Sequence, residues 1–209
     1  MTEHLGIVEI LGIAGSVSLL SGWRLYLTAL ATGLAMRFDV LPLPEHLQSL
    51  QVLANPWVMG VAGVAAFMEF FADKVVWLDS VWDTVHTFIR PIGGALLTLA
   101  VIDPSDPATQ AVAFILGGGA SLLAHGGKAS ARAVVNTSPE PFSNVAVSAV
   151  EDVATTGLLY LAYTYPVAAG AVAVVLLALS VLLLVVAWRL LRKVFLRVKP
   201  APEPAAPAN

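Results

Sequence analysis

The sequence contains no cysteine and few charged residues. The absence of cysteine excludes disulfides, thiol catalysis, iron–sulfur clusters and cysteine-ligated zinc. Only 12% of the 209 residues are charged and 58% are hydrophobic, whereas soluble domains carry about a quarter charged residues. The mean hydropathy of +0.83 agrees with this imbalance. These values exclude a soluble globular enzyme, a disordered protein and a nucleic-acid-binding protein, and they indicate that the solvent of the chain is a lipid bilayer.

The scarce basic residues gather behind the longest uncharged stretch. Residues 167–188 form 22 consecutive positions without a charge, which is enough for one membrane-spanning helix. Five basic residues follow directly: Arg189, Arg192, Lys193, Arg197 and Lys199. Because cytoplasmic flanks of membrane helices are enriched in Lys and Arg, this end of the chain is predicted to be cytoplasmic.

Hydropathy and turn-forming residues divide the chain into about six spans, at residues 5–37, 57–71, 88–102, 110–125, 144–162 and 167–188. The loops at 39–56, 103–109 and 163–166 lack Lys and Arg and are predicted to lie outside, whereas 74–90 and 128–143 carry basic residues and are predicted to lie inside. We therefore predict an all-α polytopic transmembrane helical bundle in the bacterial inner (plasma) membrane, with both termini cytoplasmic. Residues 1–199 form its single transmembrane domain, and residues 200–209 a disordered, Pro/Ala-rich cytoplasmic tail.

The first apolar segment is irregular. Residues 5–37 are too many for one straight span, and Ser21-Gly22-Trp23-Arg24 interrupts them with a glycine and a charge. The segment is either a broken span or a re-entrant hairpin of two half-length helices. An internal repeat is a further hypothesis, because residues 57–102 and 110–163 share an order of features when Lys74 is set on Lys128.

The stretch from residue 74 to 89 is amphipathic. Asp79, Asp83, His86 and Arg90 recur at spacings of four, three and four, which places them on one face of a helix. The pattern predicts an interfacial helix lying on the cytoplasmic leaflet. The alternative is a divalent metal site formed by Asp79, Asp83 and His86, since two carboxylates and an imidazole suit such an ion.

Ionisable residues within or beside the spans are the candidates for function. A charge at the centre of a membrane helix costs about 3 kcal/mol on insertion scales, so these side chains are expected to face the interior of the bundle. Asn144 belongs with them, because it begins a polar stripe on the fifth span. The candidate binding or coupling residues are Arg24, Glu69, Asp73, Lys74, His125, Lys128, Asn144, Glu151 and Asp152.

Several motifs in combination resemble one bacterial family. They are Ser21-Gly22, Gly33-Leu-Ala-Met-Arg37-Phe, Glu69-Phe-Phe-Ala-Asp73-Lys74, Asp79-Ser-Val-Trp-Asp83-Thr-Val-His86-Thr-Phe-Ile-Arg90-Pro91, Ala124-His125-Gly-Gly-Lys128-Ala-Ser-Ala-Arg132 and Asn144-Val-Ala-Val-Ser148-Ala-Val-Glu151-Asp152. Together they are similar to a family described as a domain of unknown function, DUF4126, over roughly residues 10–165. The resemblance implies a small polytopic inner-membrane protein and supplies no activity.

Three functions compete at this stage. The first is a small secondary transporter or channel for an ion or small polar solute, in which a desolvated carboxylate binds a cation or carries a proton. The second is a structural or assembly subunit whose charges pair to lock the helices. A lipid-acting intramembrane enzyme is the third, although no nucleophile–base pair, phosphate motif or HExxH-like motif is present. No cofactor and no nucleic acid is expected; the lipid bilayer is the expected partner, and homo-oligomerisation stays open.

Overall fold

The computed structural model describes residues 6–38, 45–102, 105–135 and 142–197. Its elements are α1 (Ile7–Arg37), a 3-10 helix η1 (Glu45–Ala54), α2 (Pro56–Ala72), α3 (Val76–Ile102), α4 (Pro107–Val135), α5 (Phe142–Thr164) and α6 (Pro166–Arg197). No strand occurs in these ranges. Five of the helices are long and apolar enough to cross a membrane, and α2 is a shorter apolar helix of 17 residues. The chain is thus an all-α, multi-pass membrane bundle, as predicted. The predicted tail, 200–209, lies outside the described residues.

Proline marks where several of these helices begin. Pro56, Pro107 and Pro166 each occupy the first position of a helix, where the missing N–H costs nothing. The preceding side chains complete two of these starts: Asn55 accepts a hydrogen bond from the Trp57 N–H, and Asp106 accepts one from the Thr109 N–H, both at 2.9 Å. Helix starts are therefore fixed locally, by residues that can be recognised in the sequence.

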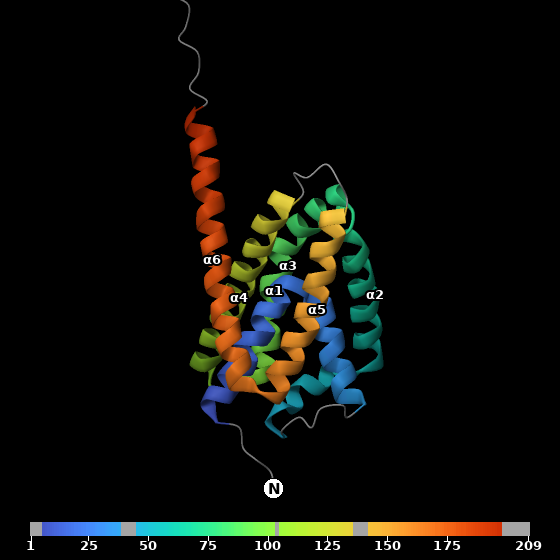
Figure 1. Ribbon diagram of the computed structural model, residues 1–209. Helices are drawn as coiled ribbons and strands as arrows, with labels where there is room; N and C mark the ends of the chain where they lie inside the picture. Colours follow the sequence, from blue (N-terminus) through green and yellow to red (C-terminus); the bar gives the residue numbers. More distant parts are fainter. Residues whose placement is uncertain (1–5, 39–44, 103–104, 136–141, 198–209) are drawn as a thin grey trace, which may run out of the picture.

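Helix α1 folds back inside the bundle. In a straight helix Gly12 and Thr32 would lie about 30 Å apart. Instead, Gly12 packs against the carbonyl of Pro166, and the Thr32 hydroxyl lies 2.9 Å from the hydroxyl of Tyr163, three residues earlier in the chain. The fold-back occurs at Arg24, whose φ of −145° and ψ of 71° are not helical. Figure 1 shows both ends of α1 at the same end of the bundle. Of the two alternatives for residues 5–37, the structure forms the re-entrant hairpin.

The re-entrant hairpin changes the topology. It enters and leaves at the end of the bundle where α5 meets α6, here called the Pro166 end; the opposite end, where α2 meets α3, is the Lys74 end. Helices α2 to α6 then run between the two ends five times (Figure 1). Consequently α1 begins at the Pro166 end and α6 finishes at the Lys74 end. The sequence predicted both termini on one side, whereas the described helical part begins and finishes at opposite ends of the bundle because α1 turns back; the side of the membrane on which each terminus lies stays a prediction.

Helix α3 corrects a second prediction. It continues from Val76 to Ile102 with Pro91 inside it, so the amphipathic stretch is the first part of a long bundle helix and no separate interfacial helix exists there. Its polar face is buried, with Asp79 at 1%, His86 at 3% and Arg90 at 0% exposure. The face turns inward because other charged helices meet it there. Helix α4 likewise continues to Val135, so Lys128 lies within a helix rather than in a cytoplasmic loop.

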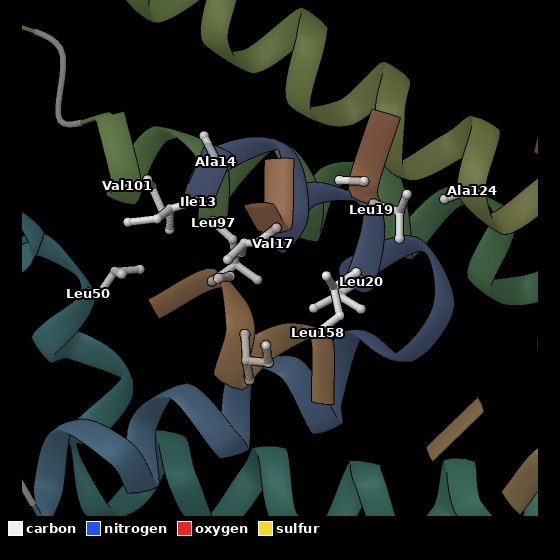
Figure 2. Close-up of a cluster of buried hydrophobic side chains, with 14 of the residues drawn as sticks. Ile13, Ala14, Val17, Leu19, Leu20, Leu50, Leu97, Val101, Ala124 and Leu158 are labelled. Carbon is white, nitrogen blue, oxygen red and sulfur yellow. The ribbon is translucent and has the colours of Figure 1, made fainter. Parts of the chain in front are cut away.

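The apolar core lies around the first half of α1. Ile13, Val17 and Leu20 pack there with Leu97 and Val101 of α3, Leu158 of α5 and Leu50 of η1 (Figure 2). Helix α6 covers one side and extends past the other helices at the Lys74 end (Figure 1). The paired segments of the hypothetical repeat form the hairpins α2–α3 and α4–α5, but Lys74 follows α2 whereas Lys128 lies inside α4. The repeat stays a hypothesis.

Candidate functional site

The turn of the α1 hairpin places backbone carbonyls among charged side chains. Gly22 is required there, because a Cβ at this position would overlap the Ser121 carbonyl and lie 2.8 Å from the Ala124 Cβ on α4. The last carbonyls of the first half-helix accept hydrogen bonds from two cations: Gly22 from Arg90 at 3.4 Å and Trp23 from Lys128 at 3.1 Å. Cations are favourable at a helix C-terminus, so the break in α1 and the buried charges stabilise one another.

Two clusters of charged residues surround this turn. The first, the Asp73 cluster, consists of Arg24, Asp73, Lys128, Arg132, Asn144, Ser148, Glu151 and Asp152. Its centre is Asp73, just beyond the end of α2 and fully buried. Its Oδ2 atom contacts Arg24, lies 3.0 Å from the Lys128 ammonium and 3.1 Å from the Arg132 guanidinium. Three cations thus converge on a single carboxylate oxygen.

Helix α5 supplies the other side of the Asp73 cluster. Glu151 Oε2 lies 3.1 Å from Arg132, 3.4 Å from Lys128 and 3.5 Å from Arg24. Asp152 lies 3.0 Å from Arg24. The side chains of Glu151 and Asp152 are 16% and 24% exposed, whereas the cations they contact are almost fully buried. The cluster is therefore cationic inside and acidic toward the surface.

The second cluster, the Arg90 cluster, consists of Glu69, Asp83, Arg90 and His125. The Arg90 guanidinium is fully buried and lies 2.8 Å from Glu69 and 3.1 Å from Asp83. Here the arrangement is reversed, because two carboxylates share one cation. Glu69 Oε2 has no hydrogen-bond partner within the described part of the chain. The Arg90 cluster thus has more carboxyl groups than cations in the interior.

Geometry assigns the protonation of His125. Its Nδ1 atom lies 2.6 Å from Arg90 Nη1, and because a guanidinium can only donate, Nδ1 must accept. The proton of the neutral ring is then on Nε2, which lies 3.1 Å from both the Asp83 carbonyl and the Thr87 hydroxyl. In this state His125 is a hydrogen-bonding bridge between α3 and α4.

The three residues of the metal alternative have separate partners. Asp83 pairs with Arg90, Asp79 lies 3.9 Å from Arg132, and His86 contacts the Tyr26 hydroxyl and the Trp82 carbonyl at 3.1 and 2.7 Å. Among the described residues no group of three metal-ligating side chains lies close enough to hold an ion. The structure gives the metal-site alternative no support.

A cavity of about 200 Å³, lined mainly by polar residues, lies between α3 and α4 at the Lys74 end. Arg132 belongs both to its wall and to the Asp73 cluster, and Asp83 connects it with the Arg90 cluster. Its other lining residues are Asp79, Ser80, Thr84, Thr87, Ala129 and Ala133. The buried charges therefore border a cavity that begins near the Lys74 end of the bundle.

Most of the residues that the sequence singled out meet in these clusters. Arg24, Asp73, Lys128, Asn144, Glu151 and Asp152 come together in one, and Glu69 and His125 in the other. Lys74 lies at the edge, where its ammonium contacts the Ser148 hydroxyl at 3.2 Å and the Phe70 ring. Glu69 pairs with Arg90.

Two arginines at the centres of these contacts were not among the candidates. Arg132 follows His125 and Lys128 by seven and four positions, and Arg90 follows Asp83 by seven. That helical spacing was a sufficient signal for a shared face. The spacing did place Arg90 on one face with Asp83, but Arg90 and Arg132 were assigned to cytoplasmic segments outside the spans and so were not taken as candidates, whereas α3 and α4 continue through both positions.

Comparison with known proteins yields one family. The family described as a domain of unknown function (DUF4126) matches residues 11–187. This range contains both clusters and all of the α1 hairpin except its first four residues. No curated protein and no solved structure matches the chain.

Proposed function

The chain belongs to the DUF4126 family of unknown function, and we propose that it moves an ion or small polar solute across the membrane through its two charged clusters. In this proposal the charged side chains of both clusters form the solute site, the carboxylates of Glu69, Asp73, Glu151 and Asp152 are its coupling groups, and the α1 hairpin positions the cations that face them. The observation that carries the proposal is the meeting of a broken helix with buried, ionisable side chains inside a membrane bundle.

Half-helices that end inside a bundle are the usual place for ion and solute sites in secondary transporters. The hairpin of α1 supports that comparison, because its inner end offers the Gly22 and Trp23 carbonyls and the Arg24 side chain to the clusters. Ionisable side chains are costly in a membrane helix, and apolar residues would insert more easily. The presence of so many ionisable side chains in this bundle therefore favours a functional role for them.

The alternative function is a structural subunit, and one observation favours it. Each of Arg24, Arg90, Lys128 and Arg132 contacts at least one carboxylate, so the pairs alone could hold the helices together. Buried ion pairs, however, contribute little stability, since replacing them with well-packed apolar residues often leaves a protein as stable or makes it more stable. The partial exposure of Glu151 and Asp152 also favours transport, because a solute can reach side chains that are not fully buried.

The distribution of basic residues supports a proposal for the orientation of the bundle in the membrane. Arg189, Arg192 and Lys193 lie at the Lys74 end of α6, so we propose that this end is cytoplasmic and that α1 begins outside. Single cysteines can be introduced at Ile7, Ser105 and Arg192, because the chain has none. An impermeant thiol reagent applied to intact cells should label the first two and spare the third. Protection of Ile7 together with labelling of Ser105 would contradict the re-entrant topology.

Reconstituted protein provides the test of transport. Proteoliposomes should support a flux of protons, inorganic cations or inorganic anions, and Asp152→Asn and Glu69→Gln should each reduce it at least about tenfold, since each removes a charge-assisted contact. Asp106→Asn is the matched control, because it makes the same charge change at an exposed helix start where Asn also caps well. If no solute moves, or if both variants lose their fold rather than their flux, the structural-subunit function is favoured instead.

A further inference from the structure

The cations of the Asp73 cluster have the arrangement of an anion site that is already filled. We infer that Arg24, Lys128 and Arg132 bind a small oxyanion, with the chemistry of inorganic phosphate or a carboxylate, and that the Asp73 side chain occupies its place when no solute is present. This inference names the class of solute and rests on the proposed function only where transport is concerned. Binding to the site can be measured without any flux.

Two carboxylate oxygens show where such an anion would sit. The same three cations contact Asp73 Oδ2 and also Glu151 Oε2, the latter at distances of 3.1 to 3.5 Å. Two guanidinium groups and an ammonium that converge on one oxygen provide several charge-assisted donors in a buried setting. Phosphate and carboxylate oxygens are the groups that such donors recognise.

Neutral groups hold the cations in position. Arg24 donates to the carbonyl and the hydroxyl of Ser148 at 3.2 and 3.0 Å, and Lys128 donates to the Trp23 carbonyl at 3.1 Å. Arg132 donates to the Asn144 side-chain oxygen. These contacts do not depend on the Asp73 or Glu151 carboxylates. The cations would therefore keep their places if one of those carboxylates were exchanged for a bound anion.

The carboxylates are held less firmly than the cations. Asp73 lies in the short connection between α2 and α3, and its Oδ1 atom has no hydrogen-bond partner among the described residues. Glu151 is 16% exposed, against 1% for Arg24. A side chain in a connection and a side chain at the surface can both move aside, whereas side chains inside packed helices cannot do so without moving the helix. This difference points to Asp73 and Glu151 as internal competitors of the solute.

Removing the charge of an ordinary binding residue weakens ligand binding, whereas removing the charge of a competing residue strengthens it. Removing the charge of Asp73 leaves three cations without their central counter-ion, so the site should bind inorganic phosphate more tightly. The full-length protein in a neutral detergent would be titrated with phosphate and followed by calorimetry. Asp73→Asn should tighten phosphate binding at least about tenfold, the factor of one charge-assisted hydrogen bond. Lys128→Gln should weaken it by a similar factor.

Matched variants separate this effect from a general change in charge. Asp106→Asn removes the same negative charge at an exposed position and should leave phosphate binding unchanged. Glu151→Gln removes the second competitor at a partly exposed position, so it should also tighten binding if Asp73→Asn does not fold. Equal affinities in Asp73→Asn and Asp106→Asn, or weaker binding in both Asp73→Asn and Glu151→Gln, would overturn the inference.

Free anions and lipid headgroups share this chemistry. The titration would therefore be repeated in nanodiscs of phosphatidylcholine with and without phosphatidylglycerol. Loss of phosphate binding only with phosphatidylglycerol would identify a headgroup as the occupant; unchanged binding would identify the free anion. If phosphate binds but no solute moves, the anion site is supported and the proposed transport is contradicted. If protons or cations move but phosphate does not bind, transport is supported and the anion site is contradicted.

Discussion

The two charged clusters of this bundle use the same residue types in opposite arrangements. In the Asp73 cluster one buried carboxylate is contacted by three cations, and its other acidic members, Glu151 and Asp152, are partly exposed. In the Arg90 cluster one buried guanidinium is contacted by two carboxylates, with a neutral histidine completing its contacts. The first has cations to spare at its centre, and the second has none.

That difference divides the roles of the clusters. Arg90 contacts the α1 turn, α2, its own helix and α4, so it joins four segments through one side chain that cannot be replaced by a neighbour. The Asp73 cluster has overlapping contacts, because each of its three cations can neutralise more than one carboxylate. A shared network tolerates exchange of one member, whereas a single hub does not.

The largest effect is expected from Arg90→Met. It leaves Glu69 and Asp83 buried without a cation, and breaking a buried pair in this way costs on the order of 3–5 kcal/mol. Arg132→Met should cost clearly less, because Arg24 and Lys128 still contact Asp73 and Glu151, its two nearest carboxylates. Thermal unfolding in detergent compares the two. Equal losses would mean that the clusters do not differ, and recovery in the double variant with Glu69→Gln would confirm the cause.

A loss of stability smaller than that of Arg90→Met is expected at the α1 turn, which contacts both clusters. Gly22→Ala places a methyl group against the Ser121 carbonyl and the Ala124 Cβ, and overpacking of this kind costs about 1–3 kcal/mol. Because the α1 turn serves both clusters, flux and stability should fall together. Gly157→Ala is the control, since a Cβ there meets no atom within 4 Å. A Gly22→Ala protein as stable as the control would show that the turn tolerates a wider separation from α4.

The sequence predicted the class of fold and most members of the site, and failed on where helices end. The spans predicted to begin at residues 57, 110 and 167 start within three residues of α2, α4 and α6. The ends of the spans were placed where charges began, and that rule is wrong when charges face the interior of a bundle. Arg132 and Asp79 were thus assigned to loops or an interfacial helix, although α3 and α4 run through both positions.

The pairing of the charges and the path of α1 depend on contacts between distant segments. Glycine and charge at residues 22–24 indicated a break, and only the contacts of Gly12 with Pro166 and Thr32 with Tyr163 distinguish a hairpin from a kinked span. Likewise, helical spacing shows that Glu69 and Asp73 are near one another, but not that they belong to different clusters. A local sequence pattern shows which residues share one face of a helix. Which other helix packs against that face depends on the whole bundle.

A moderate effect is expected at His125, where the hydrogen bond to Arg90 can be kept or removed. An Asn side-chain oxygen can accept from Arg90 in place of Nδ1, whereas Leu cannot. His125→Leu should therefore lower stability by about 1–3 kcal/mol and His125→Asn by less. If His125 only bridges helices, His125→Asn retains flux in proteoliposomes. Loss of flux in a folded His125→Asn protein would instead assign the ring a part in proton transfer.

The smallest effect is expected at Lys74, which lies at the edge of the Asp73 cluster. Its ammonium sits over the Phe70 ring, 3.1 Å from the centroid, and donates to the Phe70 carbonyl and the Ser148 hydroxyl at 3.1 and 3.2 Å. These partners are neutral and Lys74 is only partly buried, so Lys74→Gln should change the unfolding free energy by no more than about 1 kcal/mol. Phosphate binding should also change less than in Lys128→Gln, whose ammonium reaches Asp73 directly. If Lys74→Gln and Lys128→Gln weaken phosphate binding equally, Lys74 belongs to the binding site and does not lie at its edge.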